Sequence, residues 1–124
     1  MQAHANDLRS EVQQAWVELT ETALPATGIE AALDGFVHQV ASDWRQCALR
    51  PAVGALLEYS EKVTRTPAEC APVDLARLRE AGWSDASILD AVQVMAYFNY
   101  INRISDALGV EVEAQQPRWG TRAD

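Results

Sequence analysis

The two cysteines are the side chains of this chain best suited to covalent chemistry, because a thiol becomes a nucleophile or a metal ligand once it loses its proton. Cys47 and Cys70 lie 23 residues apart and form no C-x-x-C pair. Their spacing predicts neither a disulfide framework nor a zinc site. The segments around them, WRQCALRP and PAECAP, are predicted to lie between helices, so we expect neither thiol to share a helical face with an acid-base partner. We expect two free thiols, both between helices, in a reducing compartment.

A second group of polar side chains shares one face of a long predicted helix. On that face the apolar character ends at Met95, and Asn99 and Asn102 follow. One interpretation is that these residues line a pocket or a polar contact between subunits, since a buried amide must find hydrogen-bond partners. The alternative is that this end reaches solvent, with Asn99 pairing at helical spacing with Arg103 and Asp106. The first alternative makes Met95, Asn99 and Asn102 candidate substrate-binding residues.

The long helix itself is predicted over residues 84–108, which contain neither Gly nor Pro. Ser84 can cap its start and Gly109 its end. No charged residue falls between Ala91 and Asn102, so the middle of the helix should be covered on nearly every side. Four residues form an apolar stripe on the face opposite the asparagines: Tyr97, Ile101, Ile104 and Leu108.

Four further helices precede the long one. A capping box of Thr27 and Glu30 is expected to open the second, Pro51 the third and Pro72 the fourth, which Gly82 follows as a C-terminal cap. Their expected ranges are 3–22, 27–44, 51–66 and 72–81. The sequence thus predicts an all-α bundle of about five helices in one domain, residues 1–109, with a C-terminal tail at 110–124.

Composition narrows the classes of partner. Ten Lys and Arg against 18 Asp and Glu give a net charge of −8, which disfavours nucleic acid and anionic membrane surfaces. The N-terminal segment MQAHANDLRS has neither a basic start nor an apolar signal core, and no apolar run approaches the ~20 residues that span a bilayer. We expect a cytoplasmic protein with no nucleic-acid and no membrane partner.

Two segments carry a family resemblance. LLEYSEKVTRTPAEC, and then LARLREAGWSDASILDAVQVMAYFNYINRISDALGVEVE, resemble the C-terminal part of the alkylhydroperoxidase D-like proteins, in the peroxidase-related branch of the carboxymuconolactone decarboxylase superfamily. The resemblance covers residues 43–113. It implies an all-α bundle that assembles through its long helices as a homo-oligomer (dimer, trimer or hexamer). It also implies, for active members, thiol-dependent reduction of hydroperoxides by a dithiol reductant, without a bound cofactor or metal.

The resemblance also assigns a role to His4. Active members carry a Glu and then C-x-x-C-x-x-x-H, in which the second Cys attacks the peroxide and the Glu and His relay the proton. His4 falls at the His of this pattern, so the attacking Cys would stand immediately before Met1. Either the natural protein begins further upstream and is a complete peroxidase, or it keeps the bundle without the chemistry. His4 is equally well interpreted as a solvated residue in a frayed first turn.

Two other functions fit the same residues. One is a non-enzymatic helical oligomer that binds a small apolar ligand or a protein partner through the face around Met95 and Asn99. The other is the lactone decarboxylation of the superfamily's namesakes, which needs an acid-base set that His4 alone does not supply.

Overall fold

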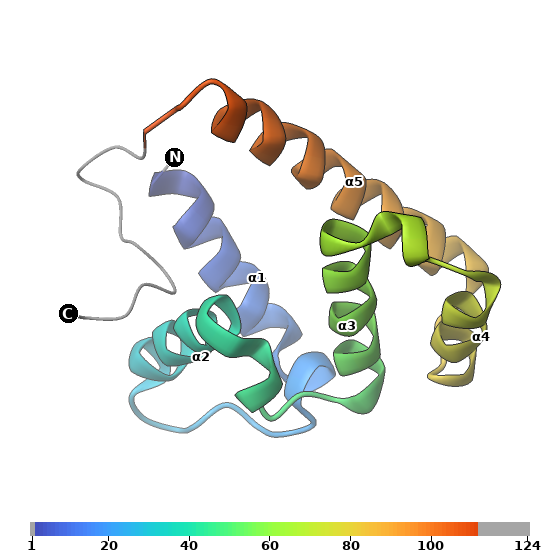
Figure 1. Ribbon diagram of the computed structural model, residues 1–124. Helices are drawn as coiled ribbons and strands as arrows, with labels where there is room; N and C mark the ends of the chain where they lie inside the picture. The colour runs from blue at the N-terminus through green and yellow to red at the C-terminus, as the bar shows by residue number, and fades with distance from the viewer. Residues whose placement is uncertain (1, 112–124) are drawn as a thin grey trace. The chain divides into compact units, whose positions relative to one another are not determined.

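The computed structural model describes residues 2–111, with side chains from residue 10 onward, and this range is all-helical (Figure 1). It contains five α-helices, two 3₁₀ helices and no strand, which confirms the all-α prediction. The elements in order are α1 (Gln2–Thr20), α2 (Ile29–Asp43), η1 (Trp44–Gln46), α3 (Pro51–Arg65), η2 (Pro67–Glu69), α4 (Pro72–Glu80) and α5 (Asp85–Ala107).

The chain divides into two compact units, with the boundary between Arg50 and Pro51. In the described range, the first unit holds α1, α2 and η1, and the second holds α3, η2, α4 and α5. Two compact units can belong to one domain or to two, so the prediction of one domain over residues 1–109 stays a prediction. Most of the predicted tail lies outside the described residues.

The first unit is a helical hairpin with a small apolar core. Val12 of α1 packs with Leu33 and Val37 of α2, and all three are buried. The rings of Trp16 and Phe36 meet beside them with centroids 5.2 Å apart. These residues recur at threes and fours along both helices, as the amphipathic pattern predicts.

The start of α2 differs from the prediction. Gly28, in the left-handed conformation (φ 70°), is the N-cap, and its carbonyl accepts the first helical hydrogen bond from the amide of Ala32 at 3.0 Å. No side chain caps this end, so the expected capping box of Thr27 and Glu30 is wrong. A glycine adopts this conformation without a Cβ clash, and the helix consequently begins after Gly28 instead of at Thr27.

Contacts made by the turn between α4 and α5 stabilise the second unit. The indole N–H of Trp83 donates to the carbonyl of Ala52 at 2.8 Å, which ties the turn between α4 and α5 to the first turn of α3. Gly82 (φ 108°) makes that turn possible, and Ser84 caps α5 by accepting from the amide of Ser87 at 3.1 Å. Leu78 and Ile88 are its buried apolar side chains. The predicted boundaries of α4 and α5 are confirmed to within about one residue.

No described helix is both long enough and apolar enough to cross a bilayer.

Candidate functional site

The two thiols belong to different units of the chain. Cys47 follows η1 in the first unit and Cys70 follows η2 in the second, and both are free and half-buried. Burial, and secondarily the negative charge of Asp43, raise the pKa of the Cys47 thiol above its ordinary value. A raised pKa disfavours the thiolate, so Cys47 lacks the activation of a peroxide-reducing cysteine. His4 lies in the helical backbone of α1, and its side chain is outside the described residues.

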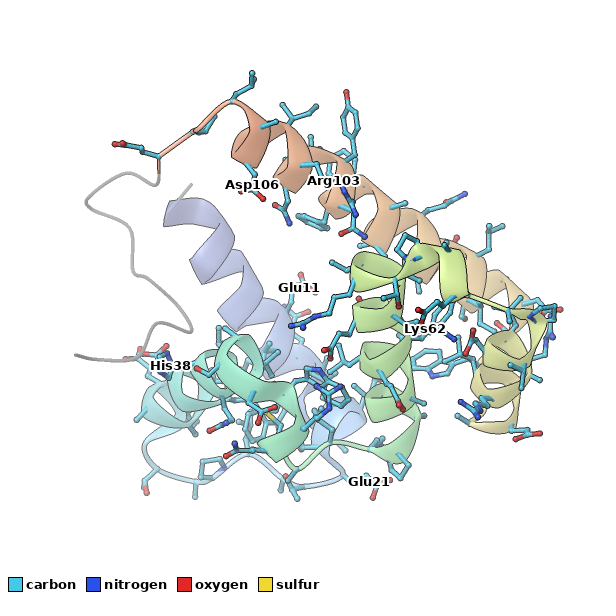
Figure 2. All side chains as sticks on the ribbon, viewed as in Figure 1. Glu11, Glu21, His38, Lys62, Arg103 and Asp106 are labelled. Atoms are coloured by element: carbon cyan, nitrogen blue, oxygen red, sulfur yellow. The ribbon has the colours of Figure 1, made fainter. Side chains whose placement is uncertain are left out.

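Cys70 borders a polar cluster that the sequence did not reveal. The ammonium of Lys62 donates to both carboxylate oxygens of Asp74, at 3.0 and 2.8 Å, and this pair joins α3 to α4. Lys62 is labelled in Figure 2. Asp74 also accepts from the amide of Ala71 at 2.8 Å, which secures the start of α4. Its side chain is only 8% exposed. The cluster therefore fixes one helix end against another helix.

Electrostatics within this cluster favour the ion pair. The hydrogen bond from Lys62, followed by that from the Ala71 amide, lowers the pKa of Asp74, and the same pairing raises the pKa of Lys62. Burial, and then the neighbouring Cys70, raise the pKa of the Tyr59 phenol. These shifts keep the phenol protonated and the carboxylate ionised at neutral pH. The cluster is a structural connection in which each charge has a partner.

The predicted binding residues lie along the face of α5 that carries Ile88 and Val92. Met95 and Asn99 are half-buried there, whereas Asn102 is exposed. Near the end of this face, the guanidinium of Arg103 donates to the carbonyl of Thr64 in the last turn of α3 at 3.3 Å (Figure 2). Arg103 therefore satisfies an end carbonyl of α3. The role of Met95, Asn99 and Asn102 in binding stays a prediction.

The opposite side of α5 carries six of the eleven large apolar side chains that are exposed in the described chain. Tyr97 is 60% exposed, Ile101 38% and Leu108 74%. The expectation that this helix is covered on nearly every side is therefore wrong for the described chain. Six residues make up what we call the outer face of α5: Val94, Tyr97, Phe98, Ile101, Ile104 and Leu108. Large apolar side chains exposed along one helix face make this face a candidate contact surface.

A hollow of about 420 Å³ lies toward the N-terminal end of the outer face. The described residues that line it all belong to α5: Asp90, Gln93, Val94, Tyr97 and Phe98. It includes none of the three predicted binding residues. In the described residues, no group of three or more His, Cys, Asp or Glu gathers where it could hold a metal ion.

Sequence analysis identified the apolar stripe but missed its full width. Val94 and Phe98 belong to the outer face and were not included, although Val94 continues the alternation of three and four residues that runs to Leu108. The sequence contains no periodic signal for the Lys62–Asp74 pair, because its members are twelve residues apart on different helices.

No protein-family model matches this chain, and neither does any curated protein. The family resemblance seen in the sequence therefore stays a prediction.

Proposed function

We propose that this chain is a peroxidase-related helical protein of the alkylhydroperoxidase D-like group, and that its own residues supply the assembling scaffold. The outer face of α5 is the observation that carries this proposal. Large apolar side chains, Tyr97, Phe98 and Leu108 among them, are more than half exposed along it. Surface of this kind is characteristic of a subunit contact. The quoted sequence phrases and the all-helical fold agree with the group.

The chemistry of the group needs a thiol pair that these 124 residues do not contain. Cys47 has a raised pKa and belongs to a different unit from Cys70. We therefore propose that the 124 residues alone do not reduce hydroperoxides. Reduction would depend on a C-x-x-C pair joined to the chain ahead of His4, with His4 relaying the proton.

The thiol part of the proposal is tested by following the loss of tert-butyl hydroperoxide in the presence of dithiothreitol. We expect the 124-residue chain to match its Cys47→Ser/Cys70→Ser variant. A chain extended by C-x-x-C, so that the second Cys stands four residues before His4, should gain dithiol-dependent turnover, and His4→Ala should lower it. Turnover by the unextended chain that disappears in the double Ser variant would contradict this assignment.

The assembly part is tested by light scattering of the purified chain. We expect a mass of at least twice 13.6 kDa. A mass of one chain at all concentrations would end the scaffold proposal.

The second candidate is the non-enzymatic oligomer that binds an apolar ligand or a protein partner. Its binding face is the one around Met95 and Asn99. The exposed outer face of α5 favours its assembly into an oligomer, and neither face requires a thiol. Unchanged assembly together with absent turnover in the extended chain would support this candidate over the first.

A further inference from the structure

We propose that Arg50 closes a clasp between residues 44–50 and the C-terminal end of α1, and that release of this clasp is a local opening of the first unit that uncovers Cys47. We define the clasp as the contacts of Arg50 with Val17, Leu19 and Glu21. All of these residues belong to the first unit. The clasp does not depend on the proposed function.

Arg50 makes three contacts with the end of α1. Its backbone amide donates to the carbonyl of Leu19 at 2.8 Å, and its Nε donates to the carbonyl of Val17 at 3.3 Å. The same Nε lies 3.9 Å from a carboxylate oxygen of Glu21. The last carbonyls of a helix lack partners in the following turn and carry partial negative charge. A guanidinium can donate to them and complement their charge at once, so Arg50 acts as the cap of this helix end.

Pro51 prepares Arg50 for this role. A residue that precedes proline is disfavoured in the helical conformation. Arg50 therefore does not extend α3, which begins at Pro51, and its amide stays available to α1. The clasp thus closes at the last residue of the first unit.

Two features make the clasp easy to open. Glu21 has a φ of 61°, the left-handed conformation that is strained for a residue with a Cβ. The side chains of Arg50 and Glu21 are 42% and 59% exposed, so water can replace their contacts. Contacts that are few and close to solvent open without unfolding of the surrounding structure.

Cys47 is the group that such an opening uncovers. It is half-buried and lies three residues before Arg50. The amide of Cys47 donates to the carbonyl of Trp44 at 3.0 Å, and that of Leu49 donates to the carbonyl of Cys47 at 2.9 Å. These bonds fold the segment on itself, so it can move as one piece once Arg50 leaves α1. The state of the clasp would then control when a reagent reaches the Cys47 thiol.

Labelling of Cys47 under native conditions tests the clasp. In a Cys70→Ser chain, Arg50→Gln should raise the rate of labelling by iodoacetamide about five-fold, the effect of losing one net hydrogen bond. The matched control, Arg65→Gln, removes an arginine that pairs with Glu61 at 3.3 Å in the second unit. It should leave the rate unchanged, as measured by mass spectrometry. Equal rates in the two variants would overturn the clasp.

Urea distinguishes the local opening from unfolding of the whole unit. A local opening exposes little surface, so the labelling rate of the Cys70→Ser chain should stay nearly constant at urea concentrations below the unfolding transition. A rate that rises with urea from the lowest concentrations onward would overturn the local opening.

A second variant acts in the opposite direction. Glu21→Gly removes the left-handed strain and only a weak, exposed ion pair, so it should slow the labelling of Cys47 several-fold. Faster labelling in Glu21→Gly would show that strain at this residue does not open the clasp.

Discussion

At the scale of single residues, three side chains that could take part in chemistry are held in unreactive states. Cys47 is kept as a thiol by burial and by Asp43. Asp74 and Lys62 neutralise each other between α3 and α4. Such groups stabilise a helical framework, and they offer neither a nucleophile nor a free base. The reactive set of a peroxidase would have to come from residues around His4.

Alkylation should report the state of Cys47. Its raised pKa leaves less thiolate near pH 8, so we expect a Cys70→Ser chain to react with iodoacetamide several-fold more slowly than free cysteine. Asp43→Asn removes the nearby negative charge and should accelerate the reaction. The rates can be followed by mass spectrometry. Modification of Cys47 as fast as that of free cysteine would contradict the raised pKa.

Acid should weaken the contribution of Asp74. Its folded pKa is below its unfolded value, so the stabilisation is complete above the unfolded pKa of about 3.9 and is lost as the pH falls through the folded pKa. We expect Asp74→Asn to lower the melting temperature at pH 7 by several degrees. The difference from the native chain should shrink below about pH 4.

Circular dichroism melts at several pH values provide the measurement. Glu80→Gln, which removes an exposed carboxylate from the same helix, is the control and should have little effect at any pH. A destabilisation by Asp74→Asn that stays constant down to pH 2 would mean that the ion pair does not stabilise the fold.

At the scale of elements, helix boundaries follow from local signals. The cap of α5 illustrates this, because the Ser84 hydroxyl accepts from the Ser87 amide. Ser84→Ala should destabilise the second unit by about 1 kcal/mol, which lowers its melting temperature by roughly 4–8 °C. Ser60→Ala, in α3 of the same unit and away from the ends of that helix, is the matched control. Equal melting temperatures for the two variants would contradict the capping role.

The difference between local signals and contacts distant in sequence explains how much of the fold was predictable. Proline, glycine and serine at helix ends act on their immediate neighbours, so the ranges of α3, α4 and α5 could be predicted closely. The start of α2 could not, because two capping signals compete there and the left-handed Gly28 prevails. Contacts such as that of Arg103 with Thr64 could not be predicted either, since they join residues 39 apart in sequence.

The candidate site was predictable only in part, for a similar reason. The stripe from Tyr97 to Leu108 is visible as a periodic pattern, but its exposure depends on which face of α5 packs against α3 and α4. That choice is made by tertiary contacts, among them Arg103. A pattern alone does not distinguish an apolar stripe that is buried within its own chain from one that is exposed and can contact a second molecule.

At the scale of the whole molecule, net charge and exposed apolar surface have opposite effects on the association of two copies. Two copies with a net charge of −8 each repel, while burial of the outer face of α5 would favour their association. Salt screens the repulsion over about 10 Å at 0.1 M and leaves apolar association intact. We therefore expect dimerisation to tighten several-fold between about 0.05 and 0.5 M NaCl, measured by sedimentation velocity. Weaker association at high salt would indicate a contact made by ion pairs.

The small core of each unit links folding to the amount of protein present. Among the described side chains, five apolar ones are buried: Val12, Leu33, Val37, Leu78 and Ile88. A dimer that depends on the outer face of α5 is stabilised by mass action, by about 2.7 kcal/mol per dimer for a hundredfold rise in concentration. Its melting temperature should rise on concentration and fall on dilution. The expression level would then set the folded fraction, and newly made chains would be most vulnerable to proteases while their copies are few.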